Sequence, residues 1–168
     1  LVLAHYTGGL MNNVSQGWTN NLANQGQPVF FLNNFDQGLS PNNYTSKIVE
    51  IGDQVDALST FGAFAGVQGQ GLISAMPDQL QAEVQVEFFS ETAGDYYLGV
   101  YVLQNNIMAN QSGQGNVLQP KLLTAAFTED WFGIPISATT GIQEFDFTID
   151  NLPELSEMDG DIEILSVI

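Results

Sequence analysis

The chain has 168 residues, of which 44% are apolar and only 12% are charged, and its formal net charge is −17 because 19 acidic residues outnumber two lysines and no arginine. Binding to nucleic acids or to anionic membrane surfaces requires many basic side chains, so this composition excludes both kinds of partner. The absence of cysteine excludes a disulfide framework, a thiol nucleophile and a thiolate metal site. The length suits one domain with its own core, or two small domains.

The first third of the chain predicts an alternation of strands and helices. Residues 1–6 favour a short strand, and a compact buried strand is expected over residues 28–34. Between them we expect a helix with Asn12 or Asn13 as its N-cap and Gly26 as its end. The helix is indicated by apolar side chains that recur at every fourth position, namely Val14, Trp18 and Leu22.

A second and stronger helical pattern follows a polar loop. Residues 46–62 carry an aliphatic stripe, with Thr45 or Ser46 as the predicted N-cap and Gly62 as the predicted end. The stripe comprises Ile48, Ile51, Val55 and Leu58. Residues 63–74 are rich in glycine and weakly apolar, which indicates either a strand with a bulge or a connector.

From about residue 76 the period of the apolar pattern changes to two. Residues 80–88 alternate strictly and predict a half-buried antiparallel strand, with its inward side chains at Leu80, Ala82, Val84, Val86 and Phe88. Further strands are expected within residues 91–106, 117–128, 140–152 and 159–168, and in the third of these Phe145, Phe147 and Ile149 should point inward. Several such strands, separated by Gly, Asn and Asp turns, are typical of a β-sandwich.

The predicted fold class is therefore α+β. We expect a small thioredoxin-like α/β part over residues 1–75 and an antiparallel, immunoglobulin-like β-sandwich over residues 76–168. The turn at Gly8 and Gly9 lies where thioredoxin-like proteins carry a Cys-x-x-Cys pair, which is missing here.

Three segments, VLAHYTGGLMNNV, GVYVLQNNIMANQSGQGN and LLTAAFTEDWFGIPISATTG, resemble the Omp28-related outer-membrane lipoproteins of Bacteroidetes. In that family an aromatic-Thr-Gly turn leads into Cys-x-x-Cys, and a later strand precedes a His-Asn-His segment. Here residues 11–14 replace the cysteines and residues 117–121 replace the histidines. The resemblance therefore implies a scaffold that has lost its redox chemistry.

Catalytic signals are weak throughout the chain. His5 is the sole histidine, and its position beside apolar residues favours a packed or surface side chain over a catalytic one. The sequence contains no GxSxG, HExxH, P-loop or GxGxxG motif. The glycine-rich residues 66–71 precede no helical pattern, so phosphate binding is not predicted. We expect a protein that is not an enzyme.

Two candidate ligand sites remain, each with a simpler explanation. The first is an acidic loop that offers carboxylates to Ca²⁺, the one cofactor we consider; its members are Glu157, Asp159, Asp161 and Glu163. A solvated Asp-Gly hairpin turn explains the same residues and is favoured. The second site is Trp131, which is flanked by Glu129 and Asp130 and is either a platform for a surface glycan or a buried core ring, with burial favoured.

The composition favours a structural protein over an enzyme or a binding module. Strands that are poor in charge and rich in amides pair edge to edge at little cost, and lysine, the usual guard against such pairing, is nearly absent. We expect an extracellular or cell-surface protein that self-assembles with copies of itself, as a filament subunit, through sheet edges and terminal strands. The alternative is a cell-surface binding module for a carbohydrate or protein ligand. The export signal is not visible in the chain.

Overall fold

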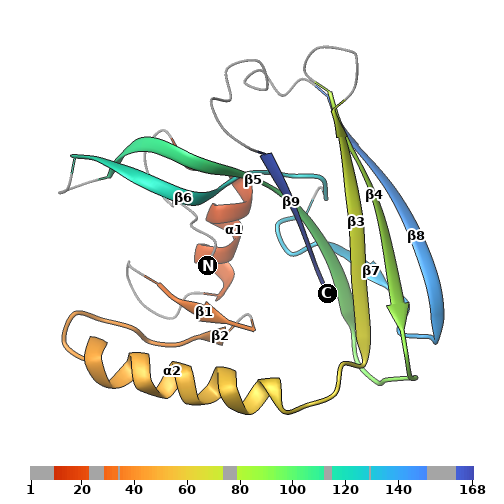
Figure 1. Cartoon of the computed structure of the whole chain (residues 1–168), viewed down its shortest axis with the longest axis horizontal. Coiled ribbons are helices and arrows are strands. Elements are labelled where there is room, and N and C mark those ends of the chain that lie inside the picture. Colours follow the sequence, from red (N-terminus) through yellow and green to blue (C-terminus); the bar gives the residue numbers. More distant parts are fainter. Residues whose placement is uncertain are drawn as a thin grey trace.

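The computed structural model describes residues 10–22, 29–33, 35–73, 79–111, 115–128, 130–150 and 162–168. The helices are α1 (Asn13–Leu22) and α2 (Tyr44–Ser59). The strands are β1 (Phe31–Leu32), β2 (Phe35–Asp36), β3 (Ala65–Ile73), β4 (Leu80–Phe88), β5 (Tyr96–Gln111), β6 (Gly115–Ala126), β7 (Ile134–Ile136), β8 (Gly141–Ile149) and β9 (Ile162–Val167). The chain is α+β, as predicted, and its strands pair in antiparallel sheets (Figure 1).

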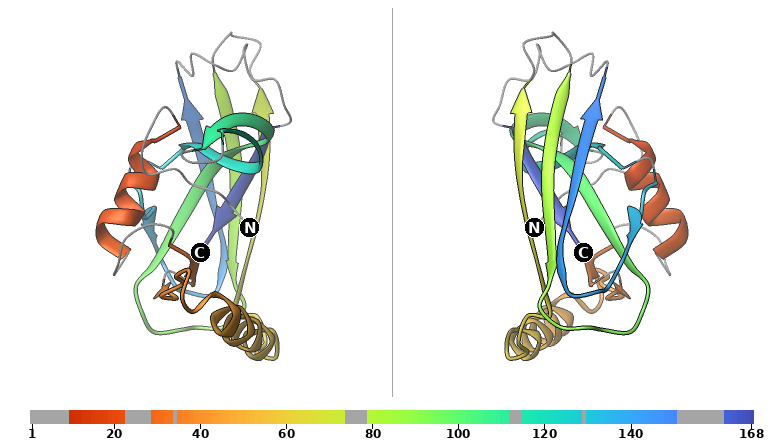
Figure 2. Two further views of the ribbon diagram at one scale, coloured as in Figure 1. Left: turned by 90° about the vertical axis from the view of Figure 1, so that its left-hand side faces the viewer. Right: turned by 90° about the vertical axis from the view of Figure 1, so that its right-hand side faces the viewer.

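The larger strands form two sheets. One has the order β3-β4-β8. The other is built on β5, which pairs with β6, β7 and β9. Because residues 101–104 of β5 pair with both β6 and β9, those two strands lie on opposite edges of β5. Figure 2 shows the two sheets face to face.

The main core lies between these sheets. Its centre consists of alternate side chains of β4 and β5, whose members are Leu80, Ala82, Val84, Val86, Phe88, Leu98, Val100 and Val102. Phe145, Phe147 and Ile149 of β8 pack against this centre. The predicted alternation of residues 80–88 and the inward side chains of β8 are both confirmed, because the period of two sorts side chains to opposite faces of a sheet.

Helix α1 covers the opposite face of β5, where a second core forms. Val14 of the helix packs with Tyr101, Leu103 and Leu123 of the sheet, and Trp18 lies at the rim of this cluster. Figure 2 shows the helix lying outside the sandwich, against β5 and β6. The face of α1 predicted from the spacing of Val14 and Trp18 is therefore the buried one.

Asn12, one of the two predicted caps, is the residue that caps this helix. Its Oδ1 accepts a hydrogen bond from the backbone N–H of Ser15 at 2.9 Å, and the Ser15 Oγ accepts one from the Asn12 N–H at 3.1 Å. This reciprocal arrangement satisfies N–H groups that have no partner within the helix. The Asn12 Nδ2 also donates to the carbonyl of Leu123 at 2.9 Å, which joins the helix to β6.

Two predictions for the following segment are wrong. Within the expected buried strand of residues 28–34, the described residues 29–33 contain only the two-residue strand β1, and the chain turns back into β2 because Asn33 adopts a left-handed conformation with φ of +48°. Its residues are half-buried, not buried. The N-cap of α2 is Asn43, not Thr45 or Ser46, and the Asn43 amide binds the backbone of Ser40 and Gly38.

Strand β3 runs in unbroken register with β4 from Ala65 to Ile73, so the glycine-rich segment is a strand without a bulge. It lies on the N-terminal side of the predicted domain boundary at residue 75 and belongs to the sheet of β4 and β8. The glycines have a packing role, because a Cβ at Gly71 would collide with the side chain of Ile164 on β9. The division into two domains stays a prediction.

Candidate functional site

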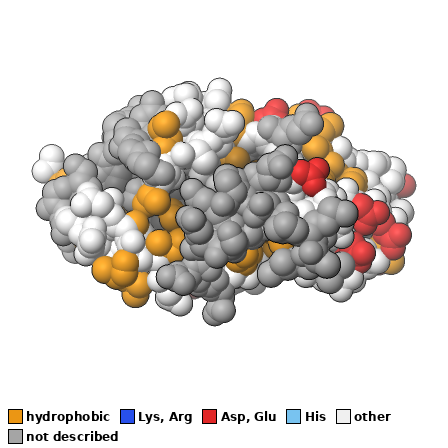
Figure 3. Space-filling model, turned by 90° about the horizontal axis from the view of Figure 1, so that it is seen from above, with side chains coloured by type: hydrophobic (Ala, Val, Ile, Leu, Met, Phe, Trp, Pro, Cys, Tyr) orange, Lys and Arg blue, Asp and Glu red, His pale blue; other side chains and the backbone are white. Residues whose placement is uncertain are grey.

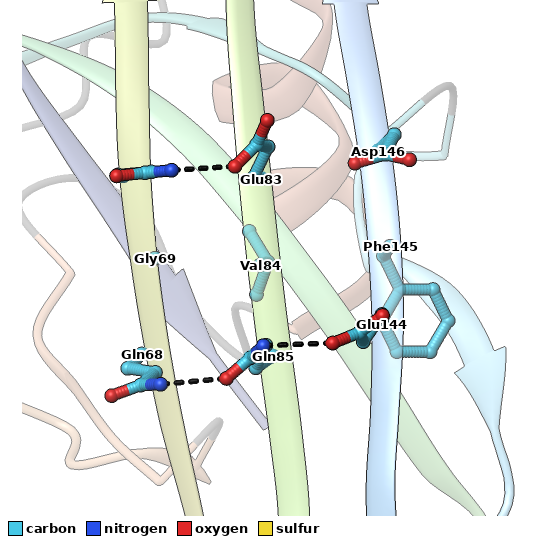
Figure 4. Close-up of a pocket in the computed structure, with 9 residues that line it drawn as sticks. Gln68, Gly69, Glu83, Val84, Gln85, Glu144, Phe145 and Asp146 are labelled. Carbon is cyan, nitrogen blue, oxygen red and sulfur yellow. Dashed lines mark hydrogen bonds between the residues drawn. The ribbon is translucent and has the colours of Figure 1, made fainter.

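The outer face of the β3-β4-β8 sheet gathers polar side chains from three strands. Between the buried apolar residues of β4, alternate side chains face away from the core. They line a shallow hollow of about 500 Å³ (Figure 4). We call the six side chains of this surface the outer polar face; they are Gln68, Gln70, Glu83, Gln85, Glu144 and Asp146.

One row of this face forms a continuous chain of hydrogen bonds. Gln68 and Glu144 both lie opposite Gln85, on either side of it. The Gln68 Nε2 donates to the Gln85 Oε1 at 2.7 Å, and the Gln85 Nε2 donates to the Glu144 Oε1 at 2.8 Å. The row therefore begins at an amide on β3 and ends at a carboxylate on β8 (Figure 4).

In the second row the glutamine of β3 again donates to a side chain of β4, but this row carries two carboxylates instead of one. Gln70 and Asp146 flank Glu83, and the Gln70 Nε2 donates to the Glu83 Oε2 at 2.5 Å. Two carboxylates thus stand on neighbouring strands, where like charges repel. Seen from above, acidic side chains gather on the side of the molecule that contains β3, β4 and β8 (Figure 3). Along β8 the outer polar face can accept hydrogen bonds at its carboxylates, whereas along β3 it carries the uncharged amides of Gln68 and Gln70, which donate towards β4.

Both edges of this sheet lack a strand partner within the described part of the chain. β3 pairs only with β4 there, and β8 pairs only with β4. Natural edges are usually guarded by lysine, proline or bulges. Neither β3 nor β8 contains lysine or proline, and both are nine residues long with regular register. These edges are therefore competent to pair with another strand.

Trp131 lies against α1 rather than standing clear of the surface. Its side chain is half-buried, and its ring occupies the space beside Gly17, where a Cβ would collide with it. Its carbonyl accepts hydrogen bonds from the Trp18 Nε1 at 3.0 Å and the Tyr101 hydroxyl at 3.3 Å. Asp130 is exposed, whereas Glu129 lies outside the described residues. This placement gives Trp131 a packing role, and glycan binding stays a prediction.

Of the predicted Ca²⁺ ligands, only Glu163 falls within the described residues; Glu157, Asp159 and Asp161 lie outside them, as does His5. The Glu163 carboxylate binds the Lys121 Nζ at 2.6 and 2.8 Å and accepts a bond from the Asn105 Nδ2 at 3.5 Å. The hydrogen bond from Lys121 lowers the pKa of Glu163. Glu163 therefore links β9 to β6 across β5.

Helix α2 exposes much of its predicted stripe. Ile51 is buried, but the other aliphatic members, together with Tyr44, are between 42% and 58% exposed. Figure 1 shows the helix at one end of the molecule, beside β1 and β2. The apolar residues of α2 are spaced alternately four and three positions apart, which is the pattern of helices that pair in coiled coils. They are Tyr44, Ile48, Ile51, Val55 and Leu58. Neither described helix is both long and apolar enough to cross a membrane.

Sequence reasoning missed the outer polar face as a unit. The alternation of β4 already predicted that Glu83 and Gln85 face away from the core. The same period in residues 65–73 and 141–149 was the signal that two more strands carry matching polar residues. Which strands lie next to one another depends on the tertiary structure, so the rows were not predictable.

The solved structure of HBP35 of Porphyromonas gingivalis is similar to this chain, with a TM-score of 0.67 at 18% sequence identity. The similarity covers 91% of this chain and 50% of HBP35, so the chain spans about half the length of that protein. No known protein family and no curated protein matches the chain by sequence. At 18% identity the similarity shows a shared fold and nothing about activity.

Proposed function

We propose that this chain is an exported, non-enzymatic structural protein of the cell surface or extracellular space that associates with copies of itself. The observation that carries the proposal is the pair of unguarded edges, β3 and β8, on one sheet. An open edge presents unpaired N–H and C=O groups that pair with another strand when one is offered. Edges on both sides of one sheet allow contacts that continue from copy to copy and form a filament.

The remaining parts of the proposal rest on composition and resemblance. Scarce lysine and absent arginine leave few sites for trypsin-like proteases, which suits a protein outside the cell. We further propose that the chain is related to the Omp28-related lipoproteins and has a thioredoxin-like first part and an immunoglobulin-like sandwich. Such a protein would have retained the fold of that family while losing its cysteines. The net charge of −17 opposes association, so salt or divalent cations must screen it.

Sedimentation velocity combined with negative-stain electron microscopy tests this function. The purified chain should sediment as small, unassembled particles at low ionic strength and should form regular elongated polymers when salt or Ca²⁺ is added. A chelator should reverse only the effect of Ca²⁺. Uniform single particles under every condition would contradict self-assembly.

The second candidate is a binding module, and the exposed stripe of α2 favours a protein ligand for it. An apolar stripe of this width fits a helix of a partner, which would cover Ile48, Val55 and Leu58. The double substitution Ile48→Ser and Val55→Ser should abolish capture of such a partner and leave polymer formation unchanged. The other candidate ligand is a glycan. If the chain binds to a glycan array and Trp131→Ala abolishes this binding without unfolding the protein, the binding site lies at Trp131.

A further inference from the structure

We propose that the copies join by parallel pairing of β8 in one copy with β3 in the next, so that the β3-β4-β8 sheet continues from molecule to molecule. In this joint, backbone N–H and C=O groups of the two edges pair, and the carboxylates of Glu144 and Asp146 lie beside the uncharged side chains of Gln68 and Gln70 of the neighbouring copy. The inference rests on the proposed self-association and names its interface. It gives the assembly a direction, because the two edges are different.

The strand directions require a parallel joint. β3 is antiparallel to β4, and β4 is antiparallel to β8, so β3 and β8 run in the same direction. A copy shifted sideways along the sheet therefore presents its β3 parallel to β8. Repeating this shift never closes on itself, which is the property a filament needs.

The side chains of the two edges differ in charge. The Nε2 atoms of Gln68 and Gln70 donate towards β4, so their carbonyl oxygens face the open edge of β3, a strand without a charged residue. The edge of β8 carries the carboxylates of Glu144 and Asp146. Each row that ends in a carboxylate on β8 thus meets an uncharged side chain on β3, and the hydrogen bonds of the joint come from the backbone.

The closed alternatives are less favourable. A joint between two β8 strands would bring together the carboxylates Glu144 and Asp146 of both copies, and opposed like charges are destabilising. A joint between two β3 strands would avoid this repulsion, but it would leave the carboxylate edges of both copies uncovered. Among assemblies with a single kind of joint, only the joint of β8 with β3 uses both edges of every copy.

The inner face of the sheet supports the same joint. Phe145 and Phe147 of β8 are only partly buried in the single chain. The corresponding positions on β3 are Gly69 and Gly71, which share their rows. The inner sides of these glycines already face Ser166 and Ile164 of β9 in the same copy. Phe147 would therefore pack beside Ile164 of the neighbouring copy and bury apolar surface that one copy leaves open.

Single cysteines provide the test, because the natural chain has none. Gly66 on β3 and Ile142 on β8 flank Glu87 on the outer face, in the row next to that of Gln68, and Glu87 and Ile142 are exposed. A Cβ at Gly66 meets only the end of the Phe89 ring, at 3.1 Å, so Gly66→Cys fits. Adjacent strands are about 4.8 Å apart, which a disulfide spans.

Gly66→Cys and Ile142→Cys are mixed under assembling conditions and oxidised mildly. We expect dimers joined by residues 66 and 142, identified by mass spectrometry, at a yield several-fold above that of a matched mixture of Glu87→Cys and Ile142→Cys. Residue 87 is one strand further from the joint, so that control reports chance collisions. If Gly66→Cys does not fold, Gln68→Cys and Glu144→Cys repeat the test in the next row.

Other results would overturn the joint. Efficient dimers of Gly66→Cys alone would show a closed pair of β3 strands, and efficient dimers of Ile142→Cys alone would show a pair of β8 strands. A mixture that polymerises but cross-links no better than the control would reject this interface while leaving self-assembly intact. If the natural chain never assembles, the proposed function and this inference both fail, and sedimentation reveals that before any cysteine is introduced.

Discussion

At the scale of single residues, the side chain of Asn12 makes hydrogen bonds both to the first turn of α1 and to β6. We predict that Asn12→Ala lowers the free energy of unfolding by about 1 to 2 kcal/mol, because it removes the N-cap bond to Ser15 together with the bond to Leu123. Urea denaturation followed by circular dichroism measures this loss. Asn21→Ala, on the exposed end of the same helix, is the control and should change stability by less than about 0.5 kcal/mol.

Tyr101 supplies a pH dependence at the same scale. Burial, opposed by a hydrogen bond from Trp18 and reinforced by the charge of Asp130, raises the pKa of Tyr101 to about 12. Its pKa in the unfolded chain is about 10. Since the folded state favours the neutral phenol, its contribution to stability is complete below pH 10 and is lost as the pH rises towards 12.

We therefore predict that the free energy of unfolding falls by about 1 kcal/mol between pH 9 and pH 11 through this group. Urea titrations at the two pH values, with absorbance at 295 nm to follow phenolate, measure the fall. Tyr101→Phe should be less stable at pH 9 and should show a smaller fall. An equal fall in both proteins would assign the pH dependence to other groups.

At the scale of elements, β3 lies close to β9 because glycine leaves room for Ile164. We predict that Gly71→Val destabilises the protein by about 1 to 3 kcal/mol through overpacking. Thermal and urea unfolding measure the change. Gly52→Ala in α2 is the contrasting variant: apart from its chain neighbours and the adjacent helix backbone, nothing lies within 4 Å of its added Cβ, so it should raise stability by about 0.5 to 1 kcal/mol.

The elements also show how far sequence reasoning reached. The alternation of residues 80–88 and the Asn12 cap were predictable because both depend on neighbours within a few positions. The short strand β7 was missed because three residues carry too little pattern to be recognised. The prediction of a single strand over residues 28–34 was wrong because Asn33 tolerates the left-handed conformation, and the chain reverses its direction there.

At the scale of the whole molecule, acidic repulsion should set the conditions for assembly. In the proposed filament the sheet repeats every three strands, or about 14 Å. This distance is about one and a half Debye lengths at 0.1 M salt but only about half a Debye length at 0.01 M, so carboxylates of successive copies repel each other mainly at low salt. Removing charge from the centre of this sheet should therefore ease polymerisation.

We predict that the double substitution Glu83→Gln and Glu87→Gln lowers the salt concentration at which half of the protein assembles, as measured by sedimentation. The control, Asp53→Asn and Asp56→Asn, removes the same two charges from the exposed surface of α2, which changes the net charge equally, from −17 to −15. An equal shift in both variants would mean that net charge, and not the sheet face, governs assembly.

The sequence by itself determined the fold class, the alternation of the larger strands, the cap of α1 and the scarcity of basic side chains, because each follows from composition or from residues close together in the chain. Only the tertiary structure decided that Gln68, Gln85 and Glu144 form one row, that α1 covers β5, and that β3 and β8 are the edges of their sheet among the described strands. Strand neighbours are chosen by packing between residues distant in sequence, and the period of two is the same whichever strands lie side by side.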